Sequence, residues 1–281
     1  MFRRIAIIGL GLIGGSLGLA IKEKRLAKEV VGVSRRPSTM RHAIDIGAVD
    51  IVTRDLKKAV RGSDIVVICT PVLMVIEIAG RIKDYLEKTT ILTDTGSTKS
   101  EIVKRIESMF SSKKVPFVGA HPIAGSEKSG IQYADKGLFK GSYCILTKTS
   151  RTDPSLVKII KGLWRDVGMK VVVMGPEEHD NLLSRLSHLP HASSVALVNA
   201  ISKKQINFTG RGLKDTTRIA SSSPEMWADI FITNRDNISK DIKRFKQELS
   251  KIELALEKCD RSTLLALLKN AKTIRDSFET K

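Results

Sequence analysis

Apolar and polar positions follow two different patterns along the chain. Up to about residue 174, short runs rich in Val and Ile, bounded by Gly, Pro, Asp or Ser, alternate with longer amphipathic segments. Strands that alternate with helices are typical of a doubly wound α/β domain with a parallel sheet. The apolar runs predict strands at residues 4–9, 30–34, 64–70, 90–95, 115–120, 142–147 and 170–174. The amphipathic segments predict helices at residues 14–24, 38–46, 72–86, 99–111 and 154–167.

Beyond residue 175 the pattern contains no convincing strand. Apolar residues recur at helical spacings over residues 177–202, 230–256 and 262–278, and a loop is expected near residues 207–212. We therefore predict two domains, an α/β domain at residues 1–175 and an all-helical domain at residues 176–281. The apolar stripes of the helical part exceed what one short bundle needs, so we expect two chains to share them in a homodimer.

A glycine-rich turn follows the first predicted strand directly. It contains Gly9, Gly11 and Gly14, with Leu12 and Ile13 between the last two glycines. Gly9 allows a tight turn, Gly11 lets the backbone approach a pyrophosphate, and Gly14 permits close packing of helix on strand. The N-terminus of the helix then faces the anion. Because the motif joins a strand to a helix of a βαβ unit, it predicts a Rossmann-type dinucleotide-binding domain.

The end of the second predicted strand indicates which dinucleotide is bound. NAD-binding domains usually carry an acidic residue about 20 residues past the glycine motif. Here Ser34, Arg35 and Arg36 occupy that place, and the first carboxylate is that of Asp45. A hydroxyl and two guanidinium groups suit a 2′-phosphate, which favours NADP as the cofactor. NAD is the alternative, because the two arginines can also stack on adenine or face solvent.

Composition and charge narrow the class of partner. The 281 residues carry a formal net charge of +18, but Lys and Arg are interleaved with acids and form no basic block. Nucleic acid is therefore not expected as a partner, and the charge favours anionic substrates and cofactors. No stretch approaches the roughly 18 apolar residues of a membrane span, and no signal peptide is recognisable. The three cysteines lie far apart without a CxxC or Cys/His cluster, so we expect no metal site and a cytoplasmic location.

Two segments carry histidines suited to proton transfer. The segment HPIAGSEKSG begins at His121, where the carboxyl edge of the sheet is expected and where α/β enzymes bind ligands. The segment SHLPHA contains His188 and His191. An imidazole can accept a proton from a substrate hydroxyl because its pKa lies near neutrality, although each histidine is alternatively a structural residue. In a third segment, Arg218 could hold a carboxylate by two parallel hydrogen bonds or lie on a solvated helix face.

Together these segments resemble the signature motifs of the prephenate/arogenate dehydrogenase family, whose members act in tyrosine biosynthesis. The matching segments are TDTGSTK from Thr93, HPIAGSEKSG from His121, SHLPHA from Ser187, KDTTRIA from Lys214 and SPEMW from Ser223. They occur in the family's order with similar separations, so the resemblance covers nearly the whole chain. It implies a nucleotide-binding domain, a helical domain that dimerises, and a substrate held by residues of both.

The resemblance also implies roles for individual residues. His121 matches a histidine that binds the ring hydroxyl and takes its proton, and Ser97 matches a serine that orients the hydroxyl, the histidine and the nicotinamide. Arg218 matches an arginine that binds the ring carboxylate, and His191 a histidine near the side chain of the substrate. Other residues expected around the substrate are Ser126, Glu127 and Asp215, with Lys214 and Trp227 in support, whereas His188 is expected to be structural. Thr70, Pro71 and Asp94 are expected to complete the cofactor site at the ends of their strands.

The expected reaction is oxidative decarboxylation of prephenate to 4-hydroxyphenylpyruvate, with hydride transfer to NAD(P). Arogenate, or both substrates, is the alternative, because Glu127 could pair with the amine of arogenate while His191 suits the keto-acid carboxylate of prephenate. Because the sequence ends at Lys281, just after the expected dimerisation helices, we expect no appended mutase or regulatory domain. Any tyrosine feedback is therefore expected to act by competition at the active site.

Two other classes of protein remain as alternatives. Two-domain dehydrogenases of the 6-phosphogluconate or 3-hydroxyisobutyrate type use a catalytic lysine in the helical domain, but this chain lacks the glycine-rich motif around it. A non-catalytic nucleotide sensor would keep Gly9, Gly11 and Gly14 without needing His121 and Ser97. The joint presence of the glycines and the candidate catalytic residues favours the enzyme.

Overall fold

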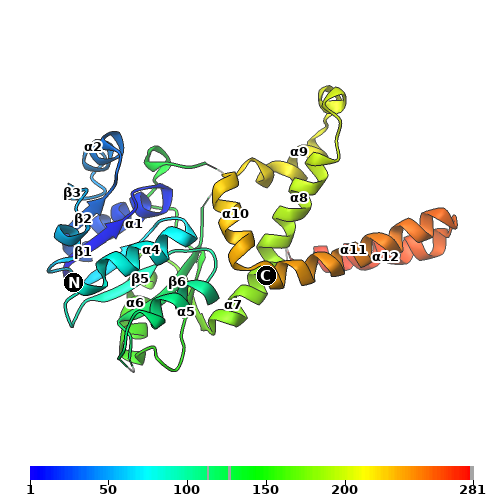
Figure 1. Ribbon diagram of the computed structural model, residues 1–281. Coiled ribbons are helices and arrows are strands. Elements are labelled where there is room, and N and C mark those ends of the chain that lie inside the picture. Colours follow the sequence, from blue (N-terminus) through cyan, green and yellow to red (C-terminus); the bar gives the residue numbers. More distant parts are fainter. Residues whose placement is uncertain (113, 126–127, 279–281) are drawn as a thin grey trace. The chain divides into compact units, whose positions relative to one another are not determined.

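The computed structural model covers residues 1–281 and describes all of them except residues 113, 126–127 and 279–281. An eight-stranded sheet forms the centre of the first part of the chain (Figure 1). Its strands are β1 (Phe2–Ile8), β2 (Ala27–Val33), β3 (Ile51–Thr53), β4 (Ile65–Ile68), β5 (Ile91–Asp94), β6 (Phe117–Ile123), β7 (Tyr143–Thr147) and β8 (Lys170–Met174).

The order of the strands places a ligand crevice at the glycine motif. The sheet runs β3-β2-β1-β4-β5-β6-β7-β8, and the first six strands are parallel, whereas β7 is antiparallel to β6. From β1 the chain builds outward through β2 and β3, and then returns to add β4 on the other side of β1. Such a reversal opens a crevice at the carboxyl ends of the two strands that flank it. Gly9 follows β1 at this point, and Cys69 follows β4.

Helices cover both faces of the sheet and bury two separate apolar layers. On one face lie α1 (Leu12–Glu23), α2 (Pro37–Asp45) and α6 (Pro154–Asp166), and on the other α3 (Leu56–Val60), α4 (Val72–Ile82) and α5 (Ser100–Ser108). The alternation of side chains along β1 sends Ile5 and Ile7 to the first layer and Ala6 and Ile8 to the second. This two-sided burial explains why the strands read as unbroken apolar runs.

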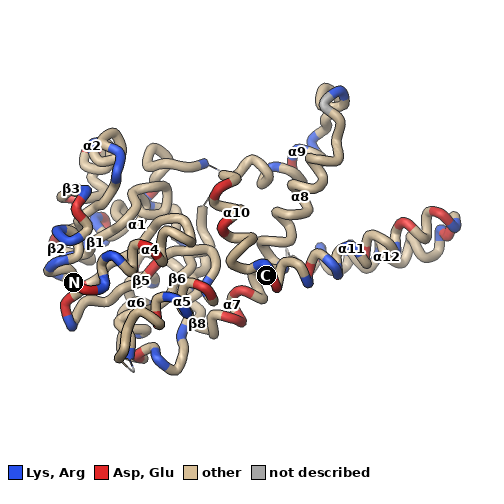
Figure 2. The backbone as a smooth tube through the Cα atoms, viewed as in Figure 1, with Lys and Arg blue, Asp and Glu red and all other residues tan. Residues whose placement is uncertain are grey.

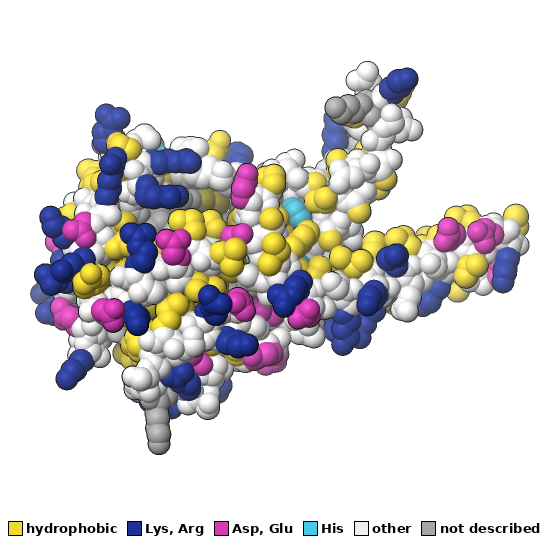
Figure 3. Space-filling model, viewed as in Figure 1, with side chains coloured by type: hydrophobic (Ala, Val, Ile, Leu, Met, Phe, Trp, Pro, Cys, Tyr) yellow, Lys and Arg dark blue, Asp and Glu magenta, His cyan; other side chains and the backbone are white. Residues whose placement is uncertain are grey.

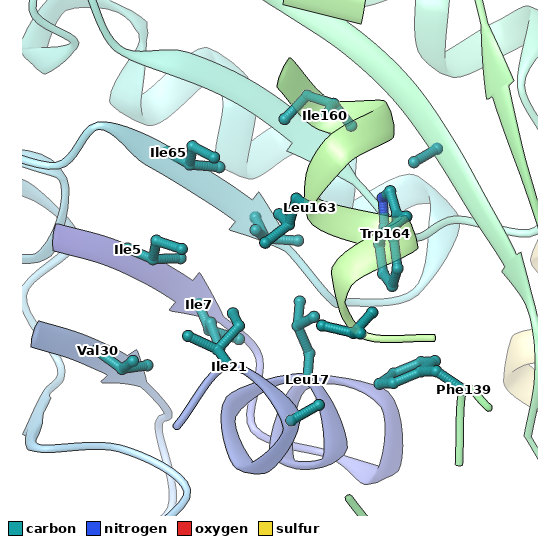
Figure 4. Packing of buried hydrophobic residues seen from close by; sticks show 14 of the residues in the cluster. Ile5, Ile7, Leu17, Ile21, Val30, Ile65, Phe139, Ile160, Leu163 and Trp164 are labelled. Carbon is teal, nitrogen blue, oxygen red and sulfur yellow. The ribbon is translucent and has the colours of Figure 1, made fainter. Parts of the chain in front are cut away.

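Figure 4 shows how the first layer is filled. Ile5 and Ile7 of β1 belong to this layer together with Leu17 and Ile21 of α1, and Trp164 of α6 packs edge-on against Phe139 with ring centroids 5.5 Å apart. Each of these side chains is fully buried. Burying a large aliphatic side chain contributes about 1.5–3 kcal/mol to folding. The layer therefore gives the edge of the sheet a rigid support.

Helices and turns follow the sheet, and no strand occurs among the described residues beyond Gly175. The elements up to residue 234 are α7 (Pro176–Leu183), a π-helical turn (Ser184–His188), α8 (Leu189–Asn199), a 3-10 turn (Lys203–Phe208), α9 (Arg211–Thr217), a second 3-10 turn (Arg218–Ser221) and α10 (Pro224–Thr233). The wide π turn precedes Pro190, which has no N–H to donate to the carbonyl of Leu186. The helix expected at residues 177–202 is therefore present over residues 176–199, but it widens to a π turn just before this proline.

The chain separates into two compact units, residues 1–234 and residues 235–281. Up to residue 278, the second unit is formed by α11 (Arg235–Glu257) and α12 (Arg261–Asp276), which contact one another. Asp260 caps α12 by accepting a hydrogen bond of 3.0 Å from the backbone N–H of Thr263. No helix among the described residues has the length and apolar character needed to cross a membrane.

The fold confirms the predicted doubly wound α/β domain followed by helices. Two short elements, β3 and α3, were not predicted. Their runs of three and five residues are too short to show a period, although Asp55 caps α3 through the N–H groups of Lys57 and Lys58. Lys and Arg are spread along the described chain, as Figure 2 shows.

Candidate active site

A cavity of about 440 Å³ opens at the crevice of the sheet. Five segments that are far apart in sequence form its walls: the glycine turn, the end of β4, the end of β5, the end of β6 with the loop after it, and the start of α10. Its lining includes Gly11, Leu12, Ile13, Thr70, Pro71, Ser97, His121, Lys128 and Met226. The structure thus brings together most of the cofactor residues expected from the glycine motif with both expected catalytic residues.

The glycine turn fits a pyrophosphate. Gly9 has a φ of +103°, and a Cβ at Gly14 would lie 1.9 Å from the carbonyl oxygen of Gly9. Only glycine can therefore occupy these two positions without displacing the backbone. By contrast, no described residue other than its chain neighbours comes within 4 Å of a Cβ placed on Gly11, which borders the cavity at the start of α1. Because no side chain caps α1, its first N–H groups are available to an anion.

The residues expected to select the cofactor lie at the end of β2. Ser34 accepts a hydrogen bond of 3.3 Å from the backbone N–H of Arg36, and the side chains of Arg35 and Arg36 are exposed. Arg36 precedes Pro37, the first residue of α2. None of the three borders the cavity itself. They present a hydroxyl and two cations at the edge of the sheet, with no carboxylate among them.

Asp94 has a different environment from the one expected of a cofactor ligand. Its side chain is fully buried and forms an ion pair with Lys99, which is also fully buried. Asp94 also accepts hydrogen bonds from the backbone N–H groups of Gly96 (2.8 Å) and Ala120 (3.1 Å), and Lys99 donates to the carbonyl of Ala120 at 3.0 Å. The pair thereby fixes the end of β5 beside β6, next to His121. Asp94 therefore does not line the cavity, and its contacts instead hold the ends of β5 and β6 together.

A second histidine lies behind His121. Nδ1 of His121 is 2.8 Å from Nε2 of His179, and Nδ1 of His179 is 2.8 Å from Oδ1 of Asp180. Asp180 also accepts hydrogen bonds from the backbone N–H groups of Lys99 (2.7 Å) and Ser100 (2.9 Å). His179 and Asp180 are almost completely buried at the start of the helical segment. The three side chains form a continuous chain from the cavity into the core.

The pKa values of this group follow from burial. Burial lowers the pKa of His121 well below its usual value, and the nearby His179, Lys99 and His188 lower it further. The pKa of His179 is also lowered, mainly by burial, although Asp180 acts in the opposite direction. The pKa of Asp180 is lowered because its hydrogen bonds to His179 and the backbone outweigh the effect of burial. Neutral imidazoles beside an ionised carboxylate are therefore favoured near neutral pH.

His191 and His188 lie away from the cavity wall. The ring of His191 stacks on Trp227 with centroids 3.5 Å apart and planes 6° from parallel, and burial lowers its pKa. Nδ1 of His191 is buried and has no hydrogen-bond partner among the described residues. His188 accepts a hydrogen bond of 3.0 Å from the side-chain amide of Asn234, and burial lowers its pKa to about 4. Trp227 thus contacts both histidines, since the ring of His188 also meets it edge-on with centroids 6.0 Å apart.

The remaining expected substrate residues are not brought to the cavity wall. Lys214 and Asp215 lie on α9 and Arg218 begins the following 3-10 turn, and all three side chains are exposed. Ser126 and Glu127 lie outside the described residues. In the described part of the chain, no group of three or more His, Cys, Asp or Glu side chains is arranged to hold a metal ion.

Sequence reasoning missed His179 and Asp180. His179 stands next to Glu177 and Glu178, and this polar run looks like the solvated start of a helix. One signal was available, because His179 precedes the buried Leu183 by four residues and therefore shares its face of the helix. A polar residue on an apolar face indicates a buried hydrogen-bond partner.

Comparisons with known proteins agree on one family. The model described as "Prephenate dehydrogenase, nucleotide-binding domain" matches residues 17–173, and "Prephenate dehydrogenase, dimerization domain" matches residues 175–270. Prephenate dehydrogenase of Bacillus subtilis is 36% identical over 98% of this chain and 76% of its own length. Cyclohexadienyl dehydrogenase of Zymomonas mobilis is 31% identical over 100% and 97%. The crystal structure of prephenate dehydrogenase from Aquifex aeolicus with hydroxyphenyl propionate and NAD+ matches with a TM-score of 0.92 and 33% identity, covering 99% of both chains.

Proposed function

The chain belongs to the prephenate dehydrogenase family, and on this basis we propose that it converts prephenate to 4-hydroxyphenylpyruvate with hydride transfer to NAD(P), a step of tyrosine biosynthesis. One observation carries the proposal. The glycine turn that fits a pyrophosphate and the imidazole of His121 border the same cavity, at the reversal point of the sheet.

The proposed chemistry conserves atoms and charge. When bound, the nicotinamide accepts the hydride that leaves C4 of the ring. His121 takes the proton of the C4 hydroxyl, so that C4 becomes a carbonyl. The bond to the ring carboxylate then breaks, carbon dioxide leaves, and the bonding electrons make the ring aromatic. The phenolate oxygen recovers one proton, so the step releases none overall.

The protein's own contribution is orientation and proton handling. Ser97 borders the cavity with His121 and is proposed to orient the hydroxyl, while His191 and Asp215 are proposed at the substrate's other groups. Arg218 is proposed to bind the ring carboxylate by two parallel hydrogen bonds. Ser126 and Glu127 complete the proposed substrate site. Thr70 and Pro71 border the cavity on the cofactor side, beside the glycine turn.

NADP is the proposed cofactor, with NAD as the second candidate. Ser34, Arg35 and Arg36 at the end of β2 supply donors and positive charge where an acid would reject a 2′-phosphate. The relative from Aquifex aeolicus was crystallised with NAD+, which favours the second candidate. Prephenate is the proposed substrate. Arogenate remains the alternative because one relative is named a cyclohexadienyl dehydrogenase, and that name specifies neither prephenate nor arogenate.

We also propose a homodimer, two domains that meet near Gly175, and a cytoplasmic location. The dimerization-domain model matches residues 175–270, and β8, the last strand, ends at Met174. Figure 3 shows hydrophobic side chains on the surface of α11 and α12. A second copy of the chain would cover such a surface.

Reduced-cofactor absorbance tests the proposed reaction. Purified protein is mixed with prephenate or arogenate and with NAD or NADP, and we expect turnover to be fastest with prephenate and NADP. His121→Asn should lower kcat/KM by about 10²–10⁴-fold, the usual contribution of general-base catalysis, and leave nucleotide binding intact. Absence of turnover in all four mixtures would contradict the proposed function.

A further inference from the structure

In the hydrogen-bond chain behind His121, the chemistry of the groups determines which atom donates and which accepts at each link. Nδ1 of His121 meets Nε2 of His179, and Nδ1 of His179 meets Asp180. We infer that His179 and Asp180 are positioning residues that hold His121 in the tautomer whose Nε2 is unprotonated, ready to accept a proton from the cavity. The catalytic importance of this tautomer rests on the proposed function, but the tautomer of His121 is itself a property of the free protein.

The assignment starts at the carboxylate. An ionised carboxylate can only accept hydrogen bonds, so Nδ1 of His179 must carry the proton that it donates to Asp180. A neutral imidazole carries one proton, which leaves Nε2 of His179 as an acceptor. Nδ1 of His121 must then donate to it. Nε2 of His121, the other nitrogen of a ring that borders the cavity, is left with its lone pair.

Asp180 is held in the ionised form that this direction requires. Its Oδ1 accepts from the backbone N–H of Lys99 and its Oδ2 from that of Ser100. These donors are the N-cap residue and the first residue of α5, which follows Ser97, and an ionised carboxylate accepts from both of them and from His179. Consistent with this, its pKa is lowered despite burial. The backbone beside Ser97 thereby anchors the end of the chain.

Burial, and after it the neighbouring His179, Lys99 and His188, favour the neutral form of His121 until it receives the substrate proton. It faces His179 and, further away, His188 of the helical segment, with Lys99 and its partner Asp94 on the sheet side. When His121 takes a proton at Nε2, both ring nitrogens carry hydrogen and the bond to His179 is retained. The negative charge of Asp180, one residue further along the chain of bonds, then lies opposite the new positive charge.

Histidine tautomers can be read directly by nitrogen-15 NMR of the full-length protein with labelled histidine, at about pH 7. The signal of His121 is identified by its loss in His121→Asn. In the wild type we expect a proton on Nδ1 and none on Nε2. In His179→Leu, which fills the buried space without an acceptor, this preference should disappear. In His179→Gln, whose amide oxygen can accept from His121, it should persist.

Steady-state kinetics of the same variants provides a second test. His179→Leu should lower kcat on the order of 10–100-fold with little change in KM, the usual effect of losing a partner that orients an active imidazole. His179→Gln should recover most of the loss. Thermal unfolding of both variants controls for packing, since a purely structural role would make activity follow stability in both.

The possible outcomes separate this inference from the proposed function. A wild-type His121 protonated on Nε2 would overturn the inference whatever the activity, and so would an unchanged Nδ1–H tautomer in His179→Leu. If the wild type shows the expected tautomer but turns over neither substrate, the proposed function fails while the positioning role stands.

Discussion

At the scale of single residues, the proposed chemistry depends on which form of His121 is present at the working pH. The base must be unprotonated, and burial, with the neighbouring His179, Lys99 and His188, holds its pKa well below the usual value of 6.5. The acidic limb of kcat/KM reports the pKa of the free enzyme's base. We therefore expect kcat/KM to stay level as the pH falls through 6.5 and to decline only at lower pH. Steady-state rates from about pH 5 to 9 test this, and an acidic limb at or above 6.5 would contradict it.

The cofactor preference is also decided by single side chains. Arg35→Ala and Arg36→Ala should each raise the KM for NADP by roughly 10–100-fold, since a hydrogen bond between charged groups contributes about 1.5–3 kcal/mol. The KM for NAD should change little. Arg41→Ala, an exposed arginine further along α2, is the matched control and should leave both constants unchanged. If the wild type prefers NAD, the role given to these arginines is wrong.

The residues of the candidate site could be predicted where a sequence motif itself requires a particular residue type. Gly9, Gly11 and Gly14 followed from the strand-turn-helix pattern, and the resemblance placed His121 and Ser97 beside one cavity. The buried ion pair of Asp94 could not be predicted in the same way. Its partner Lys99 is only five residues away, but a lysine at a helix start normally faces solvent, and only the packed sheet shows that both are buried.

At the scale of elements, α1 depends on how closely its start approaches β1. In Gly14→Ala the new methyl group would overlap the carbonyl oxygen of Gly9, so we expect a loss of about 1–3 kcal/mol in stability and weaker nucleotide binding. In Gly11→Ala the methyl group enters open space at the cavity, so nucleotide binding should weaken with a much smaller loss of stability. Thermal unfolding and nucleotide titration of both variants measure the two effects.

Gly162→Ala on α6 is the control for the glycine pair. It has no atom within 4 Å of the added methyl group, so stability should be unchanged or higher by up to about 1 kcal/mol. Equal destabilisation by Gly11→Ala and Gly14→Ala would show that close packing of α1 is not what requires glycine at residue 14.

Elements bounded by clear turn residues were predictable, whereas local irregularities inside a periodic segment were not. β8 begins and ends where the sequence predicts, because its apolar run is bounded on both sides by glycine segments. By contrast, the helix expected at residues 177–202 forms but contains a π turn before Pro190. The apolar spacing continues through this turn, so hydrophobic periodicity alone does not reveal it. His188 lies at the end of this turn and therefore in an environment that a regular helix would not give.

At the scale of the whole molecule, the last two helices carry an apolar surface that one chain leaves uncovered. Phe245, Leu249, Ile252 and Leu256 follow one another at spacings of four, three and four residues and lie on one face of α11. Their exposed fractions are 37, 50, 41 and 60%. Such a stripe is typical of a helix that packs against a partner helix. On α12, Leu265 and Leu268 are also exposed.

This stripe yields a prediction about assembly. We expect a mass of about 62 kDa in light scattering, twice the 31.0 kDa of one chain. Leu249→Glu places a charge in the stripe and should shift the mass toward 31.0 kDa, because an unpaired charge is costly to bury in an interface. Gln247→Glu adds the same charge between Phe245 and Leu249 in sequence, on the opposite face of α11, and should leave the mass unchanged. Circular dichroism should show equal helix content in both variants. If the wild type runs near 31.0 kDa, or if both variants dissociate alike, then the stripe is not the dimer contact.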